Sequence, residues 1–352
     1  MRFLPLIGVL LFVSCAKNQR NGTALAEIGE INIVHQDSLN LTKLNSVIAD
    51  NPISGEALFK RAKIFHKLGR HQEALKDVEQ ASGLEPNNQQ LTFLKSQILF
   101  KLNQLKESVL TAELAAGAGL ESPLFYTHLS KLYLEVDSLN LASQYIDEAL
   151  KVMPENAEAL RIKGSWFLKK DSLGAAVNVL QQALLLDKAN PESYDYLAKA
   201  YLKSDDRLDS AVQVTERGFL QEGSDENIGL WHNRGKIMER LGKQDSALRV
   251  YNKVLEISPK ASFVNGDIAN IYMQYGNFTK AFETFQLAID KSSKEKSIYL
   301  RAGYCLERLQ RYKQAQELYL KAQRVFPGDE DFETSYQRMT SLVERIYRSV
   351  DI

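Results

Sequence analysis

The sequence predicts an all-α fold made of repeated helix pairs, because small residues and prolines recur at fixed intervals. Near the C-terminus, Ala315 and Ala322 are seven residues apart, and Pro327 follows five residues later. Seven residues are two helical turns, so both alanines lie on one helix face, where a second helix can come close. Ala281 and Ala288 repeat the spacing one period of about 34 residues earlier. The pattern therefore indicates an array of similar helix pairs.

An alignment of the chain at this period places small residues in three columns. The first column reads Ala62, Ser96, Ser130, Gly164, Ala198, Gly235, Ala269 and Gly303. The second reads Ala74, Ser108, Ala142, Ala176, Ala211, Ala247, Ala281 and Ala315. The third reads Ala81, Ala115, Ala149, Ala183, Gly218, Val254, Ala288 and Ala322. These columns predict eight repeats over residues 55–329, with two helices crossing in each.

Prolines and glycines fall where such repeats need breaks. Proline blocks the continuation of a helix, and four repeats end on one: Pro86, Pro154, Pro259 and Pro327. Glycine supplies the turn between the two helices of a repeat at Gly69, Gly242 and Gly276. The second repeat, with Ser108 in place of alanine, and the fifth, with an extra residue near 203–210, are expected to be irregular.

This arrangement resembles the tetratricopeptide repeat, in which two antiparallel helices cross at small residues and a proline ends the unit. The resemblance covers residues 55–329. It implies a right-handed superhelical solenoid of helix–turn–helix repeats, whose concave face is lined by the first helix of each repeat and binds peptides or partner segments.

The segments on either side of the array read as its ends. Residues 38–54 look like the second helix of an N-terminal half-repeat, which would cap the array. Residues 330–352 place apolar side chains at steps of four and three, namely Phe332, Tyr336, Met339, Val343, Ile346 and Val350. A capping helix would need such a face to cover the last repeat. The same spacing also suits a self-association stripe, which stays as the alternative.

The N-terminus carries an export signal. Arg2 precedes an apolar run over residues 3–13, then Ser14 and Cys15. The run is too short to span a bilayer, which takes about 20 residues. The segment resembles the lipobox of bacterial lipoproteins, although Phe12 replaces the usual leucine. It implies a signal peptide over residues 1–14, lipidation of Cys15, and a tether over residues 15–37.

Ala16 after the cysteine, in place of aspartate, favours the outer membrane, with the periplasmic or surface side left open. An ordinary secretory signal and an unprocessed hydrophobic start are the alternatives.

Composition and spacing point to no catalytic site, metal or cofactor. The chain has 44 lysines and arginines against 44 aspartates and glutamates, so it lacks the basic field of a nucleic-acid-binding protein. Its five histidines show no metal-ligand spacing. Cys305 falls in a column that is otherwise apolar, which indicates a packing role. The sequence therefore predicts neither an enzyme nor a nucleic-acid-binding protein.

An Asp-Ser pair followed by leucine or alanine occurs five times, beginning at Asp37, Asp137, Asp171, Asp209 and Asp245. Most of these pairs lie before the second helix of a repeat, where aspartate or serine can cap exposed amides. The triplets also resemble an O-glycosylation motif of exported Bacteroidetes proteins. Capping is the simpler interpretation, and glycosylation stays open.

The concave face predicted from the resemblance combines basic and apolar side chains. Four lysines share the ninth place of their repeats: Lys63, Lys131, Lys199 and Lys236. The apolar candidates for partner contact are Phe59, Phe93, Phe100, Leu134, Leu168 and Tyr304. An extended partner with acidic or carboxylate-bearing residues would suit this surface, although the basic surplus could also be scatter on a solvated face.

The sequence thus predicts a non-catalytic scaffold that is exported, lipid-anchored and active in envelope assembly, secretion or protease recruitment. It resembles the tetratricopeptide lipoproteins of bacteria. An accessory role in glycan capture or processing at the cell envelope is the alternative, and an enzyme is the third hypothesis.

Overall fold

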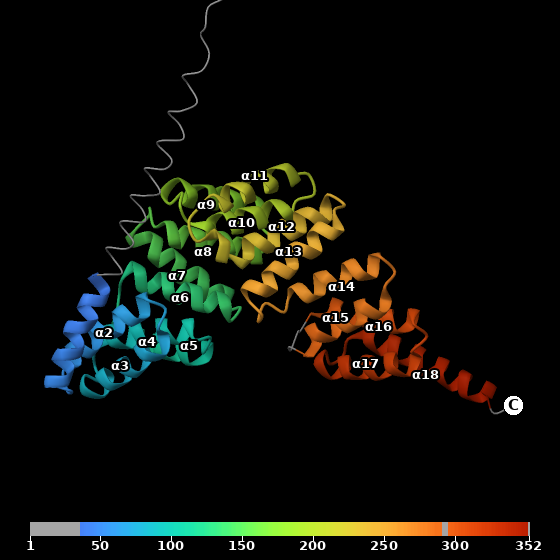
Figure 1. The fold of residues 1–352 in the computed structure, drawn as a ribbon, viewed down its shortest axis with the longest axis horizontal. Helices are drawn as coiled ribbons and strands as arrows, with labels where there is room; N and C mark the ends of the chain where they lie inside the picture. Colours follow the sequence, from blue (N-terminus) through green and yellow to red (C-terminus); the bar gives the residue numbers. More distant parts are fainter. Residues whose placement is uncertain (1–35, 291–294, 351–352) are drawn as a thin grey trace, which may run out of the picture. The chain divides into compact units, whose positions relative to one another are not determined.

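The computed structural model describes residues 36–290 and 295–350 of the 352-residue chain (Figure 1). All regular elements in these two ranges are helices, which confirms the predicted all-α class. None of the helices described there is long and apolar enough to cross a bilayer. The predicted signal peptide and Cys15 lie outside the described residues.

The chain divides into two compact blocks, one ending at Pro154 and the other beginning at Glu155. The N-terminal block starts with a helix over residues 36–50. Three helix pairs follow it: α2 (Gly55–Lys67) with α3 (His71–Leu84), α4 (Gln89–Lys101) with α5 (Leu105–Gly117), and α6 (Pro123–Glu135) with α7 (Leu139–Val152).

The C-terminal block contains five further pairs and a last helix. The pairs are α8 (Ala157–Lys169) with α9 (Leu173–Leu186), α10 (Pro191–Leu202) with α11 (Leu208–Phe219), α12 (Ile228–Arg240) with α13 (Gln244–Ile257), α14 (Val264–Gln274) with α15 (Phe278–Asp290), and α16 (Lys296–Arg308) with α17 (Tyr312–Val325). The last helix is α18 (Glu330–Val350), and a short 3₁₀ helix, η1 (Ser224–Glu226), precedes α12.

The two helices of a pair begin in different ways. Six of the eight first helices have a capping side chain that accepts hydrogen bonds from first-turn amides: Ser54, Asn88, Ser122, Asn156, Asn190 and Asn227. The other two, α14 and α16, have no side-chain cap. Most second helices have no such side-chain cap and begin after a left-handed turn residue instead. That residue is glycine at Gly69, Gly242 and Gly276, as predicted, because glycine adopts positive φ without steric cost.

The capping role predicted for the Asp-Ser pairs is wrong at four of them. The pairs at Asp209 and Asp245 lie inside the first turns of α11 and α13, and neither helix has a side-chain cap. Asp137 and Asp171 are themselves the left-handed turn residues, with φ of 59° and 56°. Ser138 and Ser172, which follow them, occupy the N-cap position but make no capping hydrogen bond. Aspartate tolerates the left-handed region better than most residues, so the pair marks the turn through its backbone conformation.

The small residues of the three columns form the buried seams between helices. All eight residues of the first column and all eight of the second are buried, and so are those of the third. At three repeats the glycine of the first column faces a large side chain of the second helix: a Cβ added at Gly164 would collide with Leu180, one at Gly235 with Tyr251, and one at Gly303 with Tyr319. Close approach therefore depends on these small residues.

The second and fifth repeats depart from the common pattern. In the second, the seam is polar: Ser96 Oγ donates to the Ser108 carbonyl oxygen at 2.9 Å, and Ser108 Oγ donates to the Ser96 carbonyl oxygen at 2.8 Å. These bonds satisfy two hydroxyls in a place where other repeats have alanine. In the fifth, Gly223 with φ of 71° and η1 lengthen the connection to α12.

Additional helices cover both ends of the described array. In the N-terminal block, Leu41 packs in one cluster with Ala62 and Phe65. In the C-terminal block, Phe332 and Met339 of α18 are buried in the core of the last repeat. The apolar face of α18 thus packs on the preceding helices over its first half.

Candidate functional site

The candidate site in each block is the surface formed by the first helices, which we call the first-helix face. Its members come from α2, α4 and α6 in the N-terminal block and from α8, α10, α12, α14 and α16 in the C-terminal block. Side chains of successive first helices meet there: the rings of Phe93 and Phe125 lie 5.2 Å apart, and Asn233 Nδ2 is 2.8 Å from Asp195 Oδ1.

In the N-terminal block, lysines stand over aromatic rings on this face. The ammonium of Lys63 lies 4.2 Å from the ring centre of Phe59, and that of Lys131 lies 5.4 Å from the ring centre of Phe100. Such cation–π contacts hold a cation beside an apolar surface. Four residues predicted from the sequence are thus brought together in two pairs. Phe93, also predicted, is half-buried against neighbouring rings.

His128 completes this surface and was missed at the sequence level. Its ring lies 5.5 Å from that of Phe93 and 6.1 Å from that of Phe100. Its Nε2 shares a hydrogen bond of 2.9 Å with Ser96 Oγ. Burial, followed by the charges of Lys131 and His66, lowers the pKa of His128 to about 3. The imidazole is therefore neutral and acts as a hydrogen-bonding part of the seam.

Two further histidines of this block lie together, with ring centres of His66 and His71 5.0 Å apart. Burial lowers the pKa of both side chains, aided by the nearby charge of Lys101. Across residues 36–290 and 295–350, no group of three or more histidine, cysteine or carboxylate side chains is placed to hold a metal ion.

In the C-terminal block, the first-helix face contains a polar network. His232 Nε2 lies 2.8 Å from Asp267 Oδ2. The ammonium of Lys236 bonds to the other oxygen of Asp267 and lies 3.3 Å from Glu239 Oε1. Lys236 is therefore occupied by carboxylates of its own chain, and the prediction that it offers a free cation to a partner is wrong.

Two partly buried aspartates on this face, Asp195 and Asp267, have pKa values shifted in opposite directions. Burial raises the pKa of Asp195 to about 6, against the opposing effects of Lys199 and of the hydrogen bond from Asn233. It would also raise the pKa of Asp267, but the hydrogen bonds and charges of His232 and Lys236 outweigh it, so that pKa is lowered. Asp267 thus stays ionised within its ion pairs.

A cavity of about 200 Å³ opens beside this network. Its lining includes His232, Asp267, the ring of Phe263, Asn270 and Arg301. Asn270 Oδ1 is buried and has no hydrogen-bond partner among the described residues. Arg301 is exposed and makes no ion pair with the residues that the structure describes. An acceptor, a cation and a ring thus meet at one opening, a combination that suits a polar peptide segment.

Two of the predicted contact residues lie in the interior. Leu134 and Leu168 are only 5% exposed, and Leu168 packs in one core cluster with Ala176 and Leu180. The prediction that they face a partner is therefore wrong for this structure. Tyr304 is 43% exposed, and its hydroxyl accepts a hydrogen bond of 2.8 Å from Arg308.

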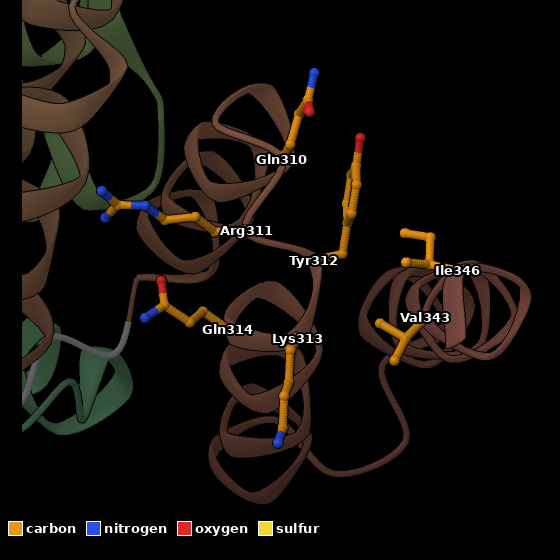
Figure 2. Close-up of a pocket in the computed structure, with 7 residues that line it drawn as sticks. All are labelled: Gln310, Arg311, Tyr312, Lys313, Gln314, Val343 and Ile346. Atoms are coloured by element: carbon orange, nitrogen blue, oxygen red, sulfur yellow. The ribbon is translucent and has the colours of Figure 1, made fainter. Parts of the chain in front are cut away.

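A separate pocket of about 340 Å³ lies between the turn before α17 and the second half of α18. Figure 2 shows Val343 and Ile346 of α18 directed toward Tyr312, while the side chain of Arg311 points away from α18; Lys313 also lines the pocket. Ile346 is 41% exposed, so the apolar face of α18 continues past the core. The structure thus covers the first half of the predicted stripe, and self-association through the rest stays a prediction.

Models of the tetratricopeptide repeat match this chain at residues 55–88, 229–261 and 267–330. Among curated proteins, human protein O-mannosyl-transferase TMTC1 is 24% identical over 251 residues, which are 67% of this chain and 25% of that protein. The Drosophila melanogaster homolog of BBSome complex member BBS4 is 23% identical, with 74% and 55% covered. Human mitochondrial import receptor subunit TOM70 is 23% identical, with 70% and 42% covered. The chain thus spans between a quarter and just over half of these relatives.

Solved structures share the fold at low identity. The Cut9–Hcn1 hetero-tetramer of the APC/C gives a TM-score of 0.64 at 13% identity, covering 84% of this chain and 57% of that one. A monomeric IFIT1 mutant with Gppp-AAAA gives 0.59 at 17%, covering 88% and 78%. PilW, a type IV pilus biogenesis factor, gives 0.53 at 17%, covering 61% and 99%. These structures show that the chain shares the α-solenoid fold, and the family models identify tetratricopeptide repeats at residues 55–88, 229–261 and 267–330.

Proposed function

We propose that this protein is a non-catalytic scaffold that binds segments of other proteins along its first-helix faces. Two of its relatives carry names that place them in assemblies or receptors, a BBSome complex member and a mitochondrial import receptor subunit. Both match over about 70% of this chain or more. Their shared repeats support a protein-interaction role here.

The observation that carries the proposal is that the buried columns of small residues leave other side chains of the first helices available to a partner. The small columns take up the packing between the two helices of a repeat, so the first helix keeps a face that the fold does not need. On that face Lys63 stands over the ring of Phe59, and Lys199 is exposed. A partner can therefore contact cations and rings without disturbing the core.

The chemistry of the face favours a partner segment that alternates acidic or carboxylate-bearing residues with apolar ones. Lys131 over Phe100 would pair with a carboxylate, while the ring edge would accept an apolar side chain. In the C-terminal block, Arg301 would pair with a carboxylate, and Asn270 Oδ1 would accept a backbone N–H. The Lys131–Phe100 pair and the cavity beside Asn270 thus both favour peptide-like partners.

We further propose that the protein is exported and held at the outer membrane by lipid on Cys15. Arg2, the apolar run over residues 3–13 and the small Ser14 before Cys15 support this location. At that membrane the scaffold would serve envelope assembly, secretion or protease recruitment.

The test is a pull-down from the native envelope with the wild type and with the double variant Lys131→Glu/Lys199→Glu. The charge reversals should reduce capture of the partner, and capture by the wild type should fall as salt rises, because exposed charges are screened over about 8–10 Å at 0.1–0.15 M ionic strength. The helical signal should not change, since both side chains lie outside the core.

The matched control is Lys106→Glu/Lys243→Glu, which changes the net charge equally at exposed places away from the first helices. Capture by this variant should equal that of the wild type. If both double variants capture the same partners as the wild type at low and high salt, the first-helix faces do not recognise partners through charge.

A further inference from the structure

A groove lies between α9 and α11, the second helices of two successive pairs in the C-terminal block. Its volume is about 470 Å³. Leu184 and Leu185 of α9 form one wall and Val214 of α11 is part of the other, while Tyr194 and Leu197 of α10 form the floor. We call it the second-helix groove. None of the residues named for the first-helix face lines it.

The dimensions of the groove match a short helix. The lining residues of α11 run from position 210 to 217, which is seven residue steps, and those of α9 run from 181 to 185, with Lys188 following the end of that helix. Along α11, at 1.5 Å per residue, this is about 10 Å, or two helical turns. Tyr194 and Leu197 are buried under the opening, which gives the groove an apolar floor.

Leu185 is the residue that the fold does not explain. Its side chain is 73% exposed. Two positions after the third column, six other repeats have glycine or a charged residue: Gly83, Gly117, Lys151, Glu256, Asp290 and Arg324. The remaining repeat has Leu220, which is 82% exposed and does not line the groove. Helix packing in this array therefore has no need of a leucine at this place.

The charges around the groove are of one sign. Lys188 and Arg217 lie at the end marked by Tyr194: the Tyr194 hydroxyl donates to the Lys188 carbonyl oxygen at 2.9 Å, and Gly218 packs directly on Tyr194. Gln181, Ser210 and Gln213 supply the other polar contacts. Among the described residues that line the groove, none carries a carboxylate. An occupant with a negative charge at this end would therefore be complementary.

We propose that the second-helix groove binds an amphipathic α-helix of a partner protein. The partner helix places aliphatic side chains at i, i+3 or i+4, and i+7 against Leu185, Val214 and the floor. A carboxylate or the C-terminal end of the partner helix lies near Lys188 and Arg217. The C-terminal end of the partner helix carries a partial negative charge, which these two cations would also attract. This site is independent of the first-helix faces, so one molecule can hold two partners.

The test is a selection of displayed helical peptides, randomised along one face, on the full chain. Enriched peptides should carry aliphatic residues at helical spacing with an acidic C-terminal end. A synthetic copy of an enriched peptide, followed by fluorescence anisotropy, should bind the Leu185→Glu variant at least about tenfold more weakly than the wild type, since that leucine would be desolvated on binding. Lys188→Glu should also weaken binding and reduce its dependence on salt.

Two controls distinguish binding in this groove from non-specific binding to exposed apolar or charged side chains. Leu220→Glu removes an equally exposed leucine outside the groove, and Lys151→Glu places a glutamate at the equivalent position of another repeat; both should bind the peptide as the wild type does. Enrichment without the aliphatic pattern, or equal affinity of Leu185→Glu, would overturn the proposal. So would a loss of dimer mass in Leu185→Glu by analytical ultracentrifugation, because the occupant would then be a second copy of the chain.

Discussion

Asn233 on α12 donates two hydrogen bonds to Asp195 on α10. Its amide nitrogen lies 2.9 Å from the backbone oxygen of Asp195 and 2.8 Å from the carboxylate. The bonds link two successive first helices of the C-terminal block. They also hold a carboxylate whose pKa is raised to about 6, mainly by burial. The contact therefore couples the packing of two repeats to pH.

The first prediction follows from that pKa. The ordinary value of an aspartate is 3.8. A carboxyl group with a raised pKa favours the folded state while it is protonated, and this contribution is lost as pH rises from about 4 through about 6. Asp195→Asn keeps the acceptor and removes the charge, so it should be more stable than the wild type above pH 6, by about 3 kcal/mol for a shift of about two units.

The measurement is urea unfolding of both proteins from pH 4 to pH 8. The difference in unfolding free energy should approach zero toward pH 4, where the wild-type carboxyl group is protonated. A difference that stays constant over the whole range would mean that the ionisation of Asp195 does not affect stability.

The second prediction concerns the network around Asp267. Lys236→Met removes one of its two hydrogen-bonding neighbours and leaves the bond to His232. Because a half-buried carboxylate loses a charged hydrogen bond, the free energy of unfolding should fall by about 1–3 kcal/mol at pH 7. Lys243→Met is the control at the exposed turn of the same repeat, and it should cost less than about 1 kcal/mol. Urea unfolding at one pH compares the two.

The third prediction tests the seam. Ala176 is fully buried between α8 and α9, so a larger side chain must push the helices apart. Ala176→Leu should destabilise the fold by about 1–3 kcal/mol and lower the melting temperature. Lys170→Ala, at an exposed turn of the same repeat, should leave the melting temperature nearly unchanged. Equal shifts in the two variants would show that the register of small residues does not determine the packing.

The fourth prediction concerns the anchor. Metabolic labelling with a fatty-acid analogue should mark the wild type and place it in the membrane fraction, because Cys15 follows an apolar run and a small residue. Cys15→Ala should lose the label and be released or misprocessed, and Cys305→Ala is the control for the other cysteine. An unlabelled wild type that fractionates as soluble would rule out the lipid anchor.

Much of the fold could be predicted from the sequence because its determinants are local and repeated. Ala142 and Ala149 are seven residues apart, and this spacing alone places them on one helix face; both are buried at the seam. Gly69 and Gly276 have the positive φ that their turns require. The same residue pattern recurs in each repeat, so an unusual residue at one position does not obscure the periodicity.

The candidate site was predicted only in part. Phe59 and Lys63 could be found because both lie on one face of a single helix, four residues apart. His128 and Asp267 were missed because their partners, Ser96 and Lys236, lie 32 and 31 residues away on neighbouring helices. Leu134 was misplaced because its position in the repeat gives no measure of burial.

The sequence by itself determined the helices, their pairing and the columns of small residues, because helical periodicity and turn residues act over a few positions along the chain. The tertiary structure alone decided which of the predicted lysines form an ion pair with another repeat. Lys199 and Lys236 occupy the same place in successive repeats, yet Lys199 is exposed and Lys236 is held by Asp267 and Glu239. The difference arises because Asp267 belongs to the repeat after that of Lys236, and only folding brings the two together.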